Sequence, residues 1–140
     1  MTEEKRKQGK KNRAKGGAFE RLVREKLESE GWIVAKWKNQ VDLEQNKIIA
    51  AKGKFNPFIG RMLLEGSGFP DFIAMRLAGE NYIKQGHQLY EVIGVESKIS
   101  KYLDAEEKKK ADWLLINQIF SKIFIAWKPG RGKIELLKYE

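Results

Sequence analysis

The sequence predicts a single α/β domain in which a central mixed β-sheet is flanked by helices. Its length of 140 residues fits one domain, and an apolar fraction of 41% is enough to form a hydrophobic core. From residue 17 onward, helical and strand-like hydrophobic patterns follow one another in the order α-β-β-β-α-β-β. Strands interrupted by helices in this way favour a mixed sheet with helices packed against it.

The N-terminal part of the chain divides into a basic tail, a helix, a strand and an insertion. Residues 1–15 have no apolar periodicity, so we expect a disordered tail there and a folded domain over residues 16–140. A helix should follow from Gly17 and stop at Gly31, and residues 32–37 predict the first strand. Residues 39–67 show no clear period and are expected to form a basic and apolar insertion. The apolar positions that recur at helical spacing are Phe19, Leu22, Val23 and Leu27.

The C-terminal part supplies the rest of the sheet and a second helix. Asp104 followed by Glu107 has the spacing of a capping box, which predicts that this helix begins at Asp104. A polar turn over residues 78–88 separates two of the expected strands. The strands are expected at residues 72–75, 90–96, 123–127 and 133–138.

The charge and the residue types narrow the possible functions. The net charge is +9, and residues 1–15 alone carry seven Lys or Arg and two Glu, which favours a polyanionic partner. The chain has no cysteine, and His87 is its only histidine, which excludes disulfides, thiolate metal sites, histidine clusters and a Ser-His-Asp relay. Neither a signal peptide nor an apolar segment of about 20 residues is visible. We therefore expect a cytoplasmic protein that does not enter the membrane.

Three charged residues on two neighbouring strands carry the chemistry. Glu96 and Lys98 share one face of their strand because strand side chains alternate, and Asp71 stands at the head of the preceding strand. If the two strands pair as a hairpin, Asp71 and Glu96 converge at one end of the sheet. Two close carboxylates repel unless a cation lies between them, and all-oxygen ligands select Mg²⁺, with Mn²⁺ as a substitute.

Such a site fits phosphodiester hydrolysis. A divalent ion can bind a phosphate oxygen and activate a water molecule. Lys98 would orient or help deprotonate that water and offset negative charge in the transition state. Glu20, from the first helix, would contribute a further oxygen ligand or hold a metal-bound water.

Phe69-Pro70-Asp71 followed by Glu96-Ser97-Lys98, with Glu20 on an upstream helix, resembles the PD-(D/E)xK nuclease superfamily, in particular archaeal Holliday-junction resolvases. The resemblance extends from Ala14 to the C-terminus. It implies a restriction-endonuclease-like α-β-β-β-α-β core and a Mg²⁺-dependent endonuclease that cuts branched DNA as a homodimer. It also implies that Asp71, Glu96 and the Ser97 carbonyl bind metal, that Lys98 is catalytic and that Glu20 is an accessory acid.

Other interpretations remain open at this stage. The gap between Pro-Asp and Glu-x-Lys is longer than in compact resolvases, which keeps restriction-type and phage-repair-type nucleases open, as well as an inactive nucleic-acid-binding protein on the same scaffold. Glu96 and Lys98 could be an ion pair at a sheet edge, Asp71 a turn residue, and Glu20 an exposed acid paired with Arg24. The basic tail could serve solubility alone. The residues expected to contact DNA are Lys10, Lys11, Arg13, Lys15, Lys52, Lys54, Arg61 and Lys108.

Overall fold

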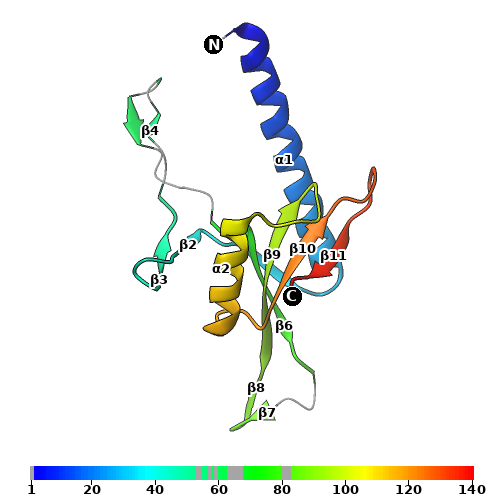
Figure 1. Ribbon diagram of the computed structural model, residues 1–140. Coiled ribbons are helices and arrows are strands. Elements are labelled where there is room, and N and C mark those ends of the chain that lie inside the picture. Colours follow the sequence, from blue (N-terminus) through cyan, green and yellow to red (C-terminus); the bar gives the residue numbers. More distant parts are fainter. Residues whose placement is uncertain (1, 53–54, 57, 59, 63–67, 80–82) are drawn as a thin grey trace.

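The computed structural model describes residues 2–52, 55–56, 58, 60–62, 68–79 and 83–140 (Figure 1). Its centre is a five-stranded sheet with the strand order β1-β6-β9-β10-β11. The pairing of β9 with β10 is parallel, and the other three pairings are antiparallel, so the expectation of a mixed sheet is confirmed. The strands are β1 (Ile33–Lys36), β6 (Phe72–Leu77), β9 (Tyr90–Lys98), β10 (Lys122–Trp127) and β11 (Glu135–Lys138).

Two helices cover opposite faces of this sheet. Side chains alternate between the two faces of the sheet along each strand, so Ile93 and Val95 of β9 face helix α1 (Glu3–Ser29). Ile123 and Ile125 of β10 face helix α2 (Ala105–Ile116). The α1 side chains buried against the sheet are Phe19, Val23 and Leu27, and those of α2 are Ala111 and Leu114. Neither α1 nor α2, as far as the described residues extend, has the apolar length needed to cross a bilayer.

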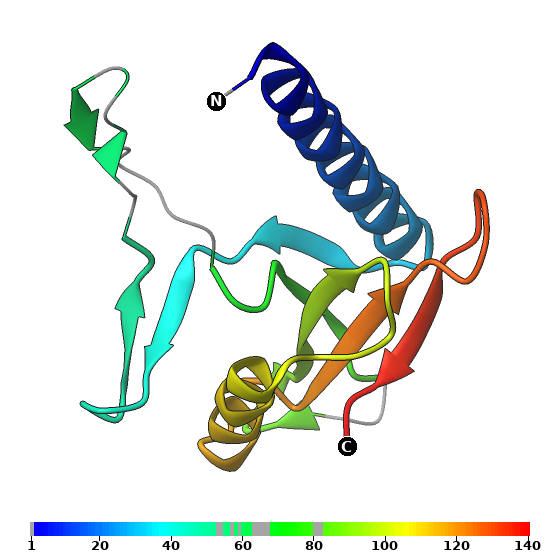
Figure 2. The same ribbon diagram turned by 45° about the horizontal axis from the view of Figure 1, so that its top comes forward.

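Helix α1 begins much earlier than the sequence predicts. It starts at Glu3, so residues 3–15 are helical and the expected disordered tail is corrected. Thr2 caps the helix by accepting a hydrogen bond from the Lys5 N–H at 3.3 Å, and Lys7 pairs with Glu3 one turn away at 3.5 Å. This segment escaped detection because hydrophobic periodicity reveals a helix only through apolar side chains at helical spacing, and the sequence of residues 3–15 has no such spacing. Figures 1 and 2 both show this half of α1 projecting away from the sheet.

The insertion contains structure that its sequence pattern did not indicate. Strands β2 (Asn39–Asp42) and β3 (Lys47–Ala50) form a hairpin, and β4 (Phe55–Asn56) pairs with β5 (Arg61–Met62). The first hairpin is anchored by Val41, which is buried in the same hydrophobic cluster as the apolar side chains of α2. Its turn is closed by Asp42, whose Oδ1 accepts the N–H groups of Glu44 and Gln45. A further short hairpin, β7 (Ile83–Lys84) with β8 (His87–Gln88), occupies the expected polar turn between β6 and β9.

Candidate active site

The structure brings Asp71 and Glu96 together at the end of the β6–β9 ladder. The register pairs Phe72 with Val95, so the residue before Phe72 lies opposite the residue after Val95. The Asp71 N–H donates to Oε1 of Glu96 at 3.0 Å, and the Ser97 N–H donates to Oδ2 of Asp71 at 2.8 Å. Each carboxylate is thus held by a backbone N–H of the other strand. The expected antiparallel pairing is confirmed, and Asp71 is more than a turn residue.

Glu96 is a buried acid in an electrostatically unfavourable position. Its relative exposure is 7%, and it is the buried charged residue among the described core positions. Burial raises the pKa of Glu96 to about 10, with further increases from the charge of Asp71 and from hydrogen bonds to Glu107 and Asp71. The nearby Lys98 lowers that pKa only in part. A carboxylate in this environment gains most from a cation, and without one it holds a proton.

Lys98 lies on the same face of β9 as Glu96 but makes its closest contact with helix α2. Its Nζ is 3.9 Å from Oε2 of Glu96 and 2.7 Å from Oε2 of Glu107. Burial opposes the charged form, yet the hydrogen bond to Glu107 and that residue's charge outweigh it and raise the pKa of Lys98. The ammonium is therefore held in its protonated form. A simple Glu96–Lys98 ion pair at a sheet edge does not describe this arrangement.

Glu107 is a site residue that the sequence analysis assigned only to the helix cap. The capping box is confirmed, since the Glu107 N–H donates to Oδ1 of Asp104 at 2.8 Å and Oε1 of Glu107 accepts the Asp104 N–H at 3.0 Å. Burial raises the pKa of Glu107, but the hydrogen bonds from Lys98 and the Asp104 backbone outweigh this and lower it. The other carboxylate oxygen is then free to hold Lys98. The sequence signal that could have indicated this contact is the short distance along the chain between Lys98, at the end of β9, and the capping box of Asp104 and Glu107.

Glu20 reaches the site from the opposite face of the sheet. Burial and then the charge of Asp71 raise its pKa, whereas Lys36, at 3.7 Å from Oε2 of Glu20, lowers it. The alternative pairing of Glu20 with Arg24 is wrong. Arg24 pairs with Glu28 at 2.8 Å and donates to the carbonyl of Val34 at 3.1 Å.

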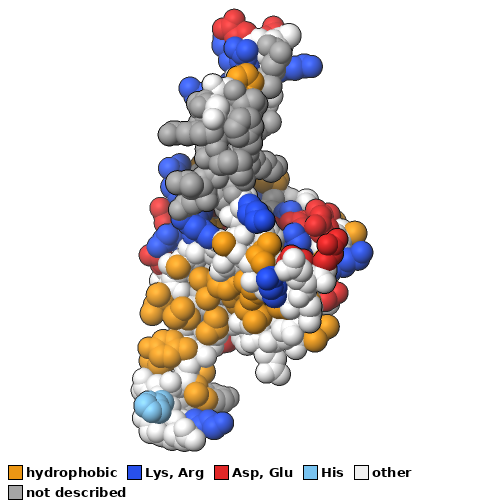
Figure 3. Space-filling model, turned by 90° about the vertical axis from the view of Figure 1, so that its left-hand side faces the viewer, with side chains coloured by type: hydrophobic (Ala, Val, Ile, Leu, Met, Phe, Trp, Pro, Cys, Tyr) orange, Lys and Arg blue, Asp and Glu red, His pale blue; other side chains and the backbone are white. Residues whose placement is uncertain are grey.

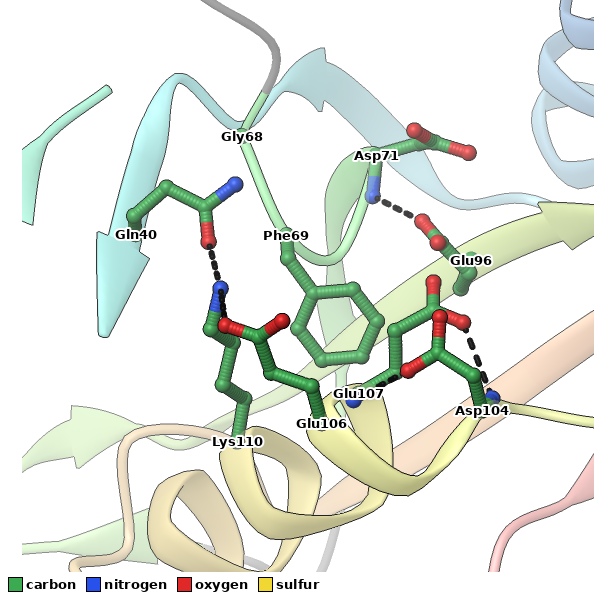
Figure 4. Close-up of a pocket in the computed structure, with 9 residues that line it drawn as sticks. All are labelled: Gln40, Gly68, Phe69, Asp71, Glu96, Asp104, Glu106, Glu107 and Lys110. Atoms are coloured by element: carbon green, nitrogen blue, oxygen red, sulfur yellow. Dashed lines mark hydrogen bonds and ion pairs between the residues drawn. The ribbon is translucent and has the colours of Figure 1, made fainter. Parts of the chain in front are cut away.

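A hollow of about 250 Å³ opens between the β6–β9 end and the start of α2 (Figure 4). Figure 4 shows the carboxylate of Asp71 directed away from this hollow, while its backbone nitrogen faces Glu96. On the other side, Lys110 donates to Oε1 of Gln40 at 3.0 Å and pairs with Glu106 at 3.6 Å. The lining residues are Gln40, Gly68, Phe69, Asp71, Glu96, Asp104, Glu106, Glu107 and Lys110.

The carboxylates do not already form a three-ligand cage. Among the described residues, no group of three or more His, Cys, Asp or Glu side chains is placed to hold a metal ion. The physical reason is that Asp71 and Glu96 direct oxygens at backbone N–H groups. Ser97 points to the other face, and its hydroxyl oxygen is buried without a hydrogen-bond partner within the described part of the chain.

The residues expected to contact DNA are spread over several elements. Lys10 and Lys11 are exposed on the projecting half of α1, Lys52 is exposed after β3, and Lys108 is exposed on α2. The side chains of Arg13, Lys15 and Arg61, and the whole of Lys54, lie outside the described residues. The described lysines among them therefore come from three separate parts of the chain.

Comparisons of this chain with models of known families, with curated proteins and with solved structures find no match. A functional assignment therefore rests on Asp71, Glu96, Lys98 and the groups around them.

Proposed function

We propose that this protein is a metal-dependent endonuclease that hydrolyses DNA phosphodiester bonds. The observation that carries the proposal is the juxtaposition of Asp71 and Glu96 across two strands, with the ammonium of Lys98 on the same face. The order Pro-Asp, Glu-x-Lys on paired strands, after a helix with Glu20, also supports a restriction-endonuclease-like core of the PD-(D/E)xK type.

The chemistry of the donor set fits Mg²⁺, with Mn²⁺ as a substitute. Asp71, Glu96 and the main-chain carbonyl of Ser97 would hold the ion, and Glu20 would serve as an accessory acid. All four are oxygen donors, which suit hard cations. A divalent cation would also offset the burial and the repulsion that raise the pKa of Glu96. When bound, Mg²⁺ supplies Lewis-acid polarisation of a phosphate oxygen and a lowered pKa for water.

Lys98 acts as a fixed positive charge beside the scissile phosphate. Its pKa is raised, so stabilising the charge that develops in the transition state suits it better than removing a proton from water. Glu107 keeps the ammonium in place through the 2.7 Å contact, and the capping box in turn keeps Glu107 in place. These contacts support a positioning role for Glu107 in the proposed reaction.

We further propose that branched DNA such as a Holliday junction is the substrate and that a homodimer is the working form. A junction presents two equivalent strands, which a symmetric pair of sites can cut together. At the far end of the sheet from the site, a second hollow offers a surface for subunit contact. It is lined by Gly31, Ile33, Arg76, Leu77 and Tyr90, of which Ile33, Leu77 and Tyr90 are exposed apolar side chains. Figure 3 shows hydrophobic side chains gathered over the middle of one face of the molecule, above the end that carries the histidine.

The test is a cleavage panel of junction, flap, single-stranded and duplex DNA with Mg²⁺ and with Mn²⁺. We expect metal-dependent cutting that falls on the order of 100-fold or more in Asp71→Ala and Lys98→Ala, while DNA binding is largely kept. Lys122→Ala is the matched control, since Lys122 pairs with Glu91 away from the site. Preferred cutting of one duplex sequence would instead indicate a restriction-type enzyme. Failure to cut any substrate with either metal would reject the proposal.

One observation favours a second candidate, a DNA-binding protein without turnover. The described side chains form no three-ligand metal group. Such a protein would bind DNA with a steep salt dependence that metal does not alter, because phosphate contacts by Lys and Arg need no divalent ion. Metal-dependent strand scission separates the two candidates.

A further inference from the structure

Helix α1 consists of two physically different halves. From Phe19 onward its apolar side chains are buried against the sheet. Residues 3–15 contain Ala14 as their only apolar side chain and carry seven of the positive charges. The described side chains at residues 3–8, 10 and 11 are all exposed. This half stands away from the sheet in both ribbon views (Figures 1 and 2).

Two consecutive glycines, Gly16 and Gly17, mark the boundary between these halves. A Cβ atom added at either position would meet nothing within 4 Å, and both residues lie within the helix. Gly68 differs, because a Cβ there would overlap the backbone oxygen of Trp37. Neither packing nor backbone conformation therefore requires glycine at 16 and 17. Since glycine is among the least favourable helix residues, two in succession weaken the helix at this boundary more than the single Gly9 does within residues 3–15.

We propose that residues 3–15 form a basic helical arm, jointed at Gly16–Gly17, that binds the phosphates along a groove of duplex DNA next to the cleavage site. The choice of DNA as the polyanion rests on the proposed nuclease function. The joint lets the arm follow the DNA while Phe19 and the residues after it keep the rest of α1 on the sheet.

The dimensions and the charge of the arm match a duplex groove. Thirteen helical residues extend about 20 Å, and the major groove, about 12 Å wide, admits an α-helix. Lys5, Arg6 and Lys7 are successive, so at about 100° per residue their side chains leave the helix in three directions. A helix lying in a groove has phosphates on both sides, which suits such a distribution. A helix that inserts at a membrane interface would need an apolar face, which the sequence of residues 3–15 does not provide.

Equilibrium binding of the full chain to a short fluorescent duplex in EDTA, over a range of salt concentrations, tests the arm. Lys10→Ala/Lys11→Ala should lower the affinity on the order of tenfold and reduce the slope of log K against log salt by about 1.8. Lys84→Ala is the control, since this exposed lysine lies on the β7–β8 hairpin, at the opposite end of the molecule from the arm (Figure 1). Equal affinities and slopes for the arm variant and Lys84→Ala would overturn the arm.

Gly16→Ala/Gly17→Ala tests the joint. This variant should gain helical circular dichroism signal but lose affinity and salt slope toward the values of the Lys10/Lys11 variant, because a stiff helix cannot follow the DNA. Binding as tight as that of the wild type would overturn the joint. Arm-dependent binding to phosphatidylserine vesicles, without arm dependence on DNA, would assign the arm to a membrane and overturn the choice of DNA.

Cleavage kinetics separate this inference from the proposed function. If the wild type cuts DNA and the arm binds it, Lys10→Ala/Lys11→Ala should raise KM. If the wild type cuts nothing while the arm still governs binding, the nuclease proposal fails and the arm stands. If the wild type cuts DNA and the arm variant has the same KM, the arm fails and the nuclease proposal stands.

Discussion

The buried carboxylate of Glu96 makes a pH-dependent contribution to stability that substitution with glutamine should remove. The pKa of Glu96 is raised from 4.5 to about 10 in the folded protein, mainly by burial and then by Asp71. Between these values the folded state keeps a proton that the unfolded chain has lost. The stabilisation is therefore complete below pH 4.5 and is lost as the pH rises toward 10.

The magnitude follows from the width of this window. Each pH unit within it changes the free energy of unfolding by about 1.4 kcal/mol. From pH 5 to pH 7 the wild type should thus lose about 3 kcal/mol relative to Glu96→Gln, because the amide cannot ionise. The Gln Oε1 can still accept the Asp71 N–H, so the ladder end is preserved.

The assay is urea unfolding followed by tryptophan fluorescence, with EDTA present, at pH 5, 6, 7 and 8. The four tryptophans supply the signal. Glu106→Gln is the control, since the side chain of Glu106 is 74% exposed and its loss should leave the pH dependence of the wild type unchanged. Added Mg²⁺ should stabilise the wild type more at pH 8 than at pH 6, because binding to Glu96 displaces its proton. A stability difference between wild type and Glu96→Gln that stays constant with pH would refute the reasoning.

Further substitutions test the site and the fold that supports it. Glu107→Ala should lower kcat for cleavage by at least tenfold, because Lys98 loses the contact that positions it. It should also lower the free energy of unfolding by about 1 kcal/mol, because the helix loses part of its cap. Glu107→Gln should keep most of the stability in urea unfolding but not the rate of cleavage. Gly68→Ala should destabilise the fold by about 3 kcal/mol or more in thermal unfolding, since its Cβ would meet backbone atoms that cannot move aside. Leu27→Ala should cost about 2–5 kcal/mol and the half-exposed Leu22→Ala clearly less, in the same urea assay.

The β6–β9 hairpin and its pair of acids were predictable because the relevant signals are local. Alternation in β9 assigns Ile93 and Val95 to one face and Glu96 to the other, whatever the rest of the fold. The proline before Asp71 marks the start of β6, and the polar connection between the strands favours antiparallel pairing. These features place Asp71 opposite Glu96 within a residue or so.

The parts that the sequence did not predict depend on tertiary contacts. The β2–β3 hairpin has one fully buried anchor, Val41, and that burial exists only because α2 lies beside it. The contact of Glu107 with Lys98 depends on how α2 sits on the sheet. Residues 3–15 are helical without apolar periodicity, and their cap and ion pair are too weak a signal to outweigh a polar composition.

The hydrophobic core and the candidate site are set by the same register. Phe72 and Val95 are both almost fully buried under α1, and they are paired directly across β6 and β9. A slip of one residue would turn Phe72 to the opposite face and lose its burial, at a cost of several kcal/mol for an aromatic side chain. That same slip would separate Asp71 from Glu96. Burial of apolar side chains thus supplies free energy that keeps the two acids side by side, against the burial and the repulsion that disfavour the charged form of Glu96 in the absence of a cation.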